Sequence, residues 1–359
     1  MLFSRSKNVV GLDIGSSAVK LVELKERKGG YKLDRVGLEP LPPEAIVEGS
    51  VADATLAVEA IQRLIERTGV RNNAFATSVS GPSVIIKRIA VPRMSEAELA
   101  DSIQWEAEQY IPFDIHDVRL DYAVLGGDEP GHDSLDVLLV AAKQDKIQDY
   151  VSLIHSAGRT PVAVDVDVFA LQNAYELVYG ADAEGVVGLL DIGASITNVH
   201  VLAAGAPVFW RDIPYGGNQV TERLQYELGL SFEDAEAVKR GQAVSGVDPA
   251  AARPLLDAMA DELAAEVERA FDLALAAVGT AARSAVVGPR VERLVLSGGG
   301  ALDARLHHVF ARRFGVPVEP LNPFLHVDYN SGEIHDQWLA SVAPMLSVAV
   351  GLAMRKVGE

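Results

Sequence analysis

The feature that most constrains this chain is an acidic glycine turn that occurs twice. The first copy lies in VVGLDIGSSAVKLVEL (residues 9–24) and the second in VVGLLDIGASITNVHVL (residues 186–202). In each copy a β-branched strand ends in Asp-Ile-Gly and leads through small residues into another strand. We interpret each copy as a hairpin, because glycine permits the tight turn. The repetition predicts two halves that open alike.

Composition bounds the possible functions. The 359 residues, 49% of them hydrophobic, can bury the cores of two or more domains. A net charge of −18 argues against nucleic acid and anionic lipid as direct partners. The absence of cysteine excludes disulfides and thiolate metal sites. MLFSRSKN lacks the apolar core of a signal peptide, and the apolar stretch at 341–354 is short for a membrane span. We therefore expect a soluble cytoplasmic protein.

The segment between the two turns reads as a separate unit. Residues 82–160 have the order strand, helix, strand, strand, helix, which predicts an inserted α+β subdomain. Its first helix is expected over 94–113, with a capping box at Ser95 and Glu98 and a stop at Pro112. After the second turn we expect a helix-rich stretch over 218–288, a strand running into glycines over 291–301, and a final helix over 341–356.

The two turns have a chemistry that suits a polyphosphate. Their backbone N–H groups and small hydroxyl residues can converge on an oxyanion, and Lys20 can add a point charge. Asp13 and Asp191 would hold a hydrated divalent cation that bridges to the phosphates, because like charges repel a direct contact. One such turn alone is most often a plain hairpin connection. Two facing turns would grip the phosphates from both sides.

Two further features extend the pattern. LSGGGA (296–301) places three glycines after a strand, which suits a flat surface for a base or ribose. Glu236 and Lys239 lie at i and i+3 on one predicted helix face, although such a pair is usually just a solvated ion pair. Neither a GxxxxGK[ST] phosphate loop nor a GxGxxG dinucleotide motif is present.

The order of these motifs resembles the actin-like ATPase superfamily. The resemblance implies an α/β, actin-like (ribonuclease H-like) two-domain ATPase fold that binds ATP with Mg²⁺. It matches three sets of residues to phosphate, phosphate and adenosine contacts in turn. The first set is Asp13, Gly15, Ser16, Ser17 and Lys20; the second is Asp191, Gly193, Ala194, Ser195 and Thr197; the third is Gly217, Glu236, Lys239, Gly298, Gly299 and Gly300.

Within the superfamily the chain is most similar to the PilM family of type IV pilus assembly. The segments that carry this likeness are 91–122, 163–175, 322–324 and 348–355. The likeness implies an inserted subdomain of the type that FtsA and PilM share. The expected subdomains are 1A (1–81, 161–185 and 341–359), 1C (82–160), 2A (186–216 and 289–340) and 2B (217–288).

The PilM likeness also implies a partner and a location. Proteins of this family bind the N-terminal cytoplasmic tail of PilN, a single-span inner-membrane protein, in a groove between the first and inserted subdomains. QYIPF (109–113) is a candidate wall of that groove, or an ordinary buried helix end. The protein would then be peripheral to the inner membrane through its partners, with ATP acting as a conformational clamp.

Hydrolysis would need a group that positions water, and the connecting segment offers Asp165 and Asp167. Alternation along a strand predicts that both lie on one face, and we favour Asp165 as the catalytic carboxylate. Two alternatives to the pilus role remain open: an FtsA-like filament-forming ATPase that polymerises, and a small-molecule kinase on the same fold.

Overall fold

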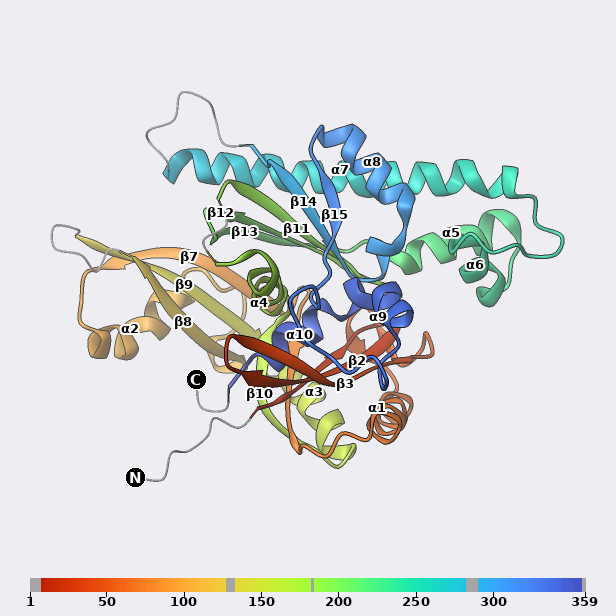
Figure 1. The fold of residues 1–359 in the computed structure, drawn as a ribbon. Helices are drawn as coiled ribbons and strands as arrows, with labels where there is room; N and C mark the ends of the chain where they lie inside the picture. The colour runs from red at the N-terminus through yellow and green to blue at the C-terminus, as the bar shows by residue number, and fades with distance from the viewer. Residues whose placement is uncertain (1–7, 127–132, 182–183, 282–289, 357–359) are drawn as a thin grey trace.

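The computed structural model describes residues 8–126, 133–181, 184–281 and 290–356. Two five-stranded sheets form the body of the molecule, and a three-stranded sheet projects from one side (Figure 1). The expected division into four subdomains remains a prediction, and its outermost residues lie outside the described ranges.

The two large sheets have the same topology. The first has the order β10-β6-β1-β2-β3 and the second the order β15-β14-β11-β12-β13. In both, the central strand (β1 or β11) pairs antiparallel with the next strand and parallel with a later one. The predicted duplication is therefore confirmed at the level of strand order. The bounds are β1 (Val10–Ile14), β2 (Ala18–Arg27), β3 (Gly30–Pro40), β6 (Ala74–Val79), β10 (Thr160–Val166), β11 (Val186–Ile192), β12 (Thr197–Ala203), β13 (Ala206–Ile213), β14 (Arg293–Ser297) and β15 (Val318–Pro320).

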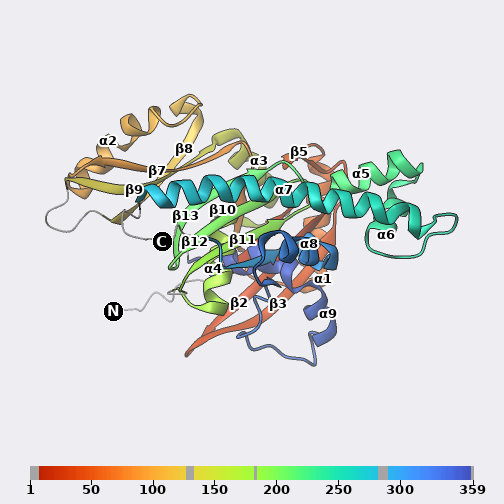
Figure 2. The same ribbon diagram turned by 90° about the horizontal axis from the view of Figure 1, so that it is seen from above.

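Helices cover the outer faces of both sheets. On the first sheet α1 begins where the Asp53 side chain accepts the N–H groups of Thr55 and Leu56, and it ends at Gly69 with φ 64°. Its apolar stripe packs into one core with α3. On the second sheet α7 runs along the outer face with α8 beside it (Figures 1 and 2). The bounds are α1 (Ala54–Thr68), α3 (Gln144–Ser156), α7 (Pro249–Ala281) and α8 (Ala304–Phe314); the short hairpin β4 (Ile46–Val47) and β5 (Ser50–Val51) precedes α1.

Two helices lie between the sheets and join them. Residues of α4 (Asp167–Tyr179) and α10 (Ser347–Ala353) share one core with strands of both sheets. The packing is at backbone distance: a Cβ on Gly351 would lie 1.7 Å from the Ala170 carbonyl oxygen. A Cβ on Gly11 of β1 would lie 2.0 Å from that of Ala349. Helix α4 is therefore packed, directly or through α10, against strands of both sheets.

The C-terminal region is not the single helix expected over 341–356. It divides at Pro344 into α9 (Asp336–Val342), the 3-10 turn η3 (Ala343–Leu346) and α10. The break follows from proline, which cannot donate a helical hydrogen bond. The run Asp336–Ala353 is, among the described residues, the one helical stretch long and apolar enough to cross a membrane, but 61% of it is buried inside the structure. Packing between the sheets accounts for its apolar composition.

The inserted unit is a sheet of order β7-β9-β8 with helix α2 across it. The predicted capping box at Ser95 and Glu98 is present, and the unit has its own apolar core. Helix α3, which we had placed in this unit, packs instead into the core of the first sheet. The unit also touches the second half, where Trp210 Nε1 donates to the Ile86 carbonyl at 2.7 Å. The bounds are β7 (Val84–Pro92), α2 (Glu96–Glu108), η1 (Ile115–Asp117), β8 (Val118–Gly126) and β9 (Ser134–Lys143).

The helix-rich stretch after the second sheet begins with two short helices. They are α5 (Gly217–Leu228) and α6 (Phe232–Lys239), and they pack against the start of α7 in a small core. The strand β14 runs into η2 (Gly299–Leu302), so the triple glycine forms the turn that we expected.

Candidate functional site

The two acidic turns have the same backbone geometry. In the first, the Gly15 N–H donates to the Ala18 carbonyl at 3.1 Å, and in the second the Gly193 N–H donates to the Ile196 carbonyl at 3.0 Å. Each turn follows the central strand of its sheet. Asp13 and Asp191 therefore occupy equivalent positions near the ends of β1 and β11.

The first turn carries its own cation. Asp13 lies opposite Lys20 in the β1–β2 ladder, and the Lys20 ammonium lies 3.1 Å from the carboxylate. A Cβ on Gly15 would lie 2.7 Å from that ammonium, so glycine leaves room for the lysine to cross the turn. Burial raises the pKa of Asp13; Lys20 acts against this effect and Asp167 adds to it.

The second turn lacks an equivalent cation. Asn198 stands opposite Asp191, and its amide donates to Asp212 at 2.7 Å instead. Burial, reinforced by the charges of Asp13 and Asp167, raises the pKa of Asp191 to about 7. The charges of Asp13 and Asp167 both raise the pKa of Asp191, so the two turns and the start of α4 influence one another electrostatically.

This arrangement fits a hydrated divalent cation. The described residues contain no group of three or more His, Cys, Asp or Glu side chains that could hold a metal alone. Half-buried carboxylates with raised pKa values gain from a cation, and Mg²⁺ is usually bound through one or two carboxylates, water and substrate phosphates. Asp13 and Asp191 suit that role.

A second cluster lies on α5 and α6. Lys239 Nζ donates to the Gly217 carbonyl at 3.0 Å and to Thr221 Oγ1 at 2.7 Å, and it pairs with Glu236. Burial would raise the pKa of Glu236, but hydrogen bonds from Lys239 and Thr221 outweigh it and lower the pKa. The predicted pair is thus part of a network rather than a solvated surface pair. Sequence reasoning missed Thr221, a mid-helix threonine with no motif of its own.

The triple glycine adjoins both groups. Gly298 has φ 78°, and a Cβ there would lie 2.7 Å from Asp191 Oδ1. A Cβ on Gly300 would lie 2.3 Å from Ile192 Cγ2, whereas one on Gly299 would meet no atom within 4 Å. Gly299 therefore presents an open backbone surface, which fits a planar base or a ribose.

Backbone hydrogen bonds join these parts into one site. The Gly217 N–H donates to the Gly193 carbonyl at 3.0 Å, and the Asn218 N–H donates to that of Ala194 at 2.7 Å. Arg305, which follows the triple glycine, donates to the Lys239 carbonyl at 2.8 Å. The structure thus brings together the second turn, α5, α6 and the triple glycine.

The hydroxyl residues of the turns differ in availability. Ser17 is exposed and Ser16 is half-buried, so both can meet a ligand. Ser195 is buried and accepts from the Asn218 amide at 3.3 Å. Thr197 is fully buried, and its hydroxyl donates to the Tyr215 carbonyl at 2.7 Å. The structure therefore argues against Thr197 as a ligand contact and assigns it to packing.

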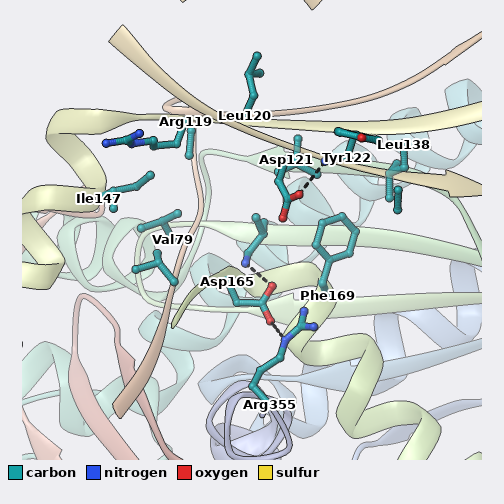
Figure 3. Close-up of a pocket in the computed structure, with 15 residues that line it drawn as sticks. Val79, Arg119, Leu120, Asp121, Tyr122, Leu138, Ile147, Asp165, Phe169 and Arg355 are labelled. Carbon is teal, nitrogen blue, oxygen red and sulfur yellow. Dashed lines mark hydrogen bonds and ion pairs between the residues drawn. The ribbon is translucent and has the colours of Figure 1, made fainter. Parts of the chain in front are cut away.

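The structure also argues against Asp165 as the catalytic carboxylate. Arg355 Nε lies 2.5 Å from Asp165 Oδ2, and both residues line a cavity whose lining includes no residue of the two turns (Figure 3). Asp167, in contrast, acts on both Asp13 and Asp191. Our expectation that the two lie on one face fails because β10 ends at Val166 and α4 begins at Asp167, so strand alternation stops between them.

Asp165 lines a groove of about 510 Å³ between the inserted unit and the first half. Figure 3 shows Asp121 and Tyr122 on one side of it and Asp165, Phe169 and Arg355 on the other. QYIPF (109–113) contributes none of its lining residues; Ile111 is buried in the core of the inserted unit. Its alternative interpretation, a buried helix end, fits the structure.

Comparisons with known proteins agree with this architecture. The family described as type IV pilus assembly protein PilM matches residues 11–357. The solved PilM-PilN type IV pilus biogenesis complex contains a chain that is 30% identical, with a TM-score of 0.83 over 99% of this chain and 100% of that one. MreB 5 of Spiroplasma citri bound to AMPPNP has a TM-score of 0.50 at 13% identity, over 97% of this chain and 95% of that one. Cell division protein FtsA of Escherichia coli K12 is 26% identical over 258 residues, which are 65% of this chain and 60% of FtsA.

Two sheets of one topology, each with an acidic turn after its central strand, define a protein of the actin-like ATPase fold. The likeness to MreB supports this fold and nothing further. The family match extends over nearly the whole chain, and the chain belongs to the PilM family of type IV pilus assembly proteins.

Proposed function

We propose that this protein is an ATP-binding component of a type IV pilus inner-membrane complex, and that it holds the cytoplasmic N-terminal tail of a PilN-type protein. The groove between the inserted unit and the first half would hold the tail. The protein would then work in the cytoplasm, attached to the inner membrane through its partner. The solved PilM-PilN complex, similar over 99% of this chain, supports this choice of partner.

ATP would lie in the cleft between the two halves. The phosphates would meet Gly15, Ser16, Ser17 and Lys20 on one side and Gly193, Ala194 and Ser195 on the other. Asp13 and Asp191 would hold Mg²⁺, which would neutralise phosphate charge. The ribose and base would lie against Gly217, Glu236, Lys239 and Gly298–Gly300. The open Gly299 surface and the buried carboxylates without a second cation support this assignment.

One feature of the structure supports the proposal that ATP acts as a conformational clamp on peptide binding. Asp165, in β10, lines the groove, whereas Asp167, two residues later at the start of α4, acts electrostatically on Asp13 and Asp191 of the two turns. A ligand between the two turns that moves Asp167 would then also move the wall of the groove. If the protein hydrolyses ATP, Asp167 is the carboxylate of this segment placed to orient water.

Calorimetry tests the proposal in two steps. Mg-ATP should bind the full chain, and chelation of Mg²⁺ should weaken that binding. The N-terminal tail peptide of a PilN-type protein from the same organism should bind with an affinity that changes when Mg-ATP is present. Binding of neither ligand would refute the proposed function, and peptide binding that is indifferent to nucleotide would refute the clamp.

The FtsA likeness favours one second candidate, a filament-forming role. Pelleting assays with and without Mg-ATP test it directly. Nucleotide-dependent sedimentation of the full chain would support polymers, and its absence over a wide protein concentration range would exclude them.

A further inference from the structure

We infer that the groove binds its peptide by strand addition, with the peptide pairing along the free edge of β8. The inference rests on the proposed function, because it says how the tail of the PilN-type protein is held in the groove. In this binding mode main-chain hydrogen bonds supply affinity and alternate side chains enter pockets.

Two sheet edges border the groove. In the part of the chain that the structure describes, β8 pairs with β9 alone and β10 with β6 alone, so each ends its sheet. The cavity is lined by residues of both edge strands (Figure 3). An edge strand presents unpaired N–H and C=O groups, which are a ready template for another strand.

Each edge carries a backbone donor that is satisfied only by the preceding side chain. The Tyr122 N–H donates to Asp121 Oδ1 at 2.9 Å, and the Val166 N–H donates to Asp165 Oδ1 at 2.8 Å. Figure 3 shows both bonds at the groove. A carboxylate that bonds its own neighbouring N–H can rotate away when a peptide carbonyl replaces it. Without a peptide, each edge N–H is thus satisfied by a neighbouring carboxylate, and a peptide carbonyl can take the place of that carboxylate.

The edge of β8 suits a strand better than that of β10. Five consecutive β8 residues, Arg119–Ala123, line the cavity, whereas β10 contributes only Val164–Val166 before α4 begins. The Lys143 N–H donates to the Ser83 carbonyl on the β7 side of β9, so alternation along the ladder turns the N–H of Leu139 to that side as well. Tyr122 lies opposite Leu139, and its N–H, like every second N–H of β8, therefore points away from β9.

The groove offers matching chemistry for the side chains of an extended peptide. Apolar side chains form most of its wall: Val79, Leu120, Leu138, Val140, Ile147 and Phe169. Charged groups of both signs, Arg119, Asp121, Asp165 and Arg355, share the lining with them. A peptide with apolar residues at alternate positions fits this surface, because side chains of a strand alternate between its faces.

A backbone scan of the peptide tests the inference. Single N-methylation at successive positions of the synthetic tail peptide should weaken binding to the full chain by roughly tenfold at every second position and little between them. Failure of the unmodified peptide to bind would refute the proposed partner and leave the proposed ATP binding untouched. If the peptide binds but the effect of N-methylation has no two-residue period, strand addition is refuted and the proposed function is not. That result would mean that the peptide binds as a helix or through its side chains only.

A pair of variants tests it from the protein side. Tyr122→Pro removes the N–H that faces the groove and no ladder hydrogen bond, while Tyr122→Ala removes the side chain and keeps the N–H. Tyr122→Pro should bind the tail peptide roughly five- to tenfold more weakly than Tyr122→Ala. Mg-ATP binding and thermal unfolding should report whether both variants fold. Equal peptide affinity in two folded variants would overturn the inference, and the N-methyl scan decides the matter if Tyr122→Pro does not fold.

Discussion

The two acidic turns share a backbone but differ in how their carboxylates are balanced. Asp13 lies opposite Lys20, which pairs with it at 3.1 Å. Asp191 lies opposite Asn198, whose amide points to Asp212. Asp212 also accepts the Gly81 N–H from the first half at 2.7 Å. The first turn thus compensates its own charge, while the second uses the same ladder position to hold the two halves together.

This difference separates two roles that a duplicated motif could have shared. Under the proposed function, Lys20 would add a positive charge for phosphate at the first turn. The second turn has no lysine at the equivalent ladder position, and burial with the charges of Asp13 and Asp167 raises the pKa of Asp191 to about 7. The duplicated hairpins share a backbone, and the residue opposite the aspartate, Lys20 or Asn198, makes their local charge different.

Loss of both carboxylates should have the largest effect. Asp13→Asn combined with Asp191→Asn should weaken Mg-ATP binding by more than about 100-fold, because changes to groups that merely support metal ligands already cost 10- to 100-fold. Isothermal titration calorimetry measures the affinity, and circular dichroism should show an unchanged fold. Unchanged affinity in the folded double variant would show that the turns do not form one site.

Lys20 and Asn198 provide the direct contrast between the copies. Lys20→Ala should weaken ATP binding by roughly tenfold or more, because a hydrogen bond to a charged group contributes about 1.5–3 kcal/mol. Asn198→Ala should leave ATP affinity within about threefold but lower the free energy of unfolding by roughly 1–2 kcal/mol, since Asp212 loses a buried partner. Nucleotide titration and urea unfolding of both variants measure these effects. Equal losses of ATP affinity would contradict the division of roles.

The pH dependence of stability should reveal Asp191. Its pKa is about 7 in the folded protein and 3.8 ordinarily, so between these values the native state keeps a proton that the unfolded chain has lost. Stability without ligand should therefore fall as pH rises through this window, by at most roughly 1.4 kcal/mol per pH unit from this group. Asp191→Asn has no carboxyl group to lose this proton. Its melting temperature should therefore rise relative to that of the unsubstituted protein between pH 5 and pH 8. Parallel curves for the two proteins would show that Asp191 is ionised in the cleft.

The two halves, the turns and the capping box at Ser95 and Glu98 could be predicted from the sequence, because each depends on residues that are close together along the chain. A strand that ends in Asp-Ile-Gly specifies its own hairpin, and a repeated hairpin predicts a repeated sheet. The family resemblance suggested the adenosine contacts, which stay a prediction. Periodicity and motif order therefore sufficed for the architecture.

The errors share a different cause. Asp165 and Thr197 were assigned to the site by type and position, but their polar atoms are satisfied by Arg355 and by the Tyr215 carbonyl, which lie far away in sequence. Thr221 was missed because its place in the polar network comes from a hydrogen bond with Lys239, which is distant in the sequence. Sequence spacing shows which face a residue is on, not which distant group lies within reach.

The triple glycine has no counterpart after β6, where Gly81 leads into the inserted unit, and it allows the finest test of the comparison. Gly300→Ala should lower the free energy of unfolding by roughly 1–3 kcal/mol, because its Cβ would lie 2.3 Å from Ile192 Cγ2. Gly299→Ala meets no atom within 4 Å and should change stability by less than about 0.5 kcal/mol. If the open side of Gly299 faces the nucleotide, that same variant should weaken ATP binding by a few-fold while affinity for inorganic triphosphate is unchanged. Equal weakening for both ligands would move the contact from the adenosine to the phosphates, and no weakening for either would place the base elsewhere in the cleft.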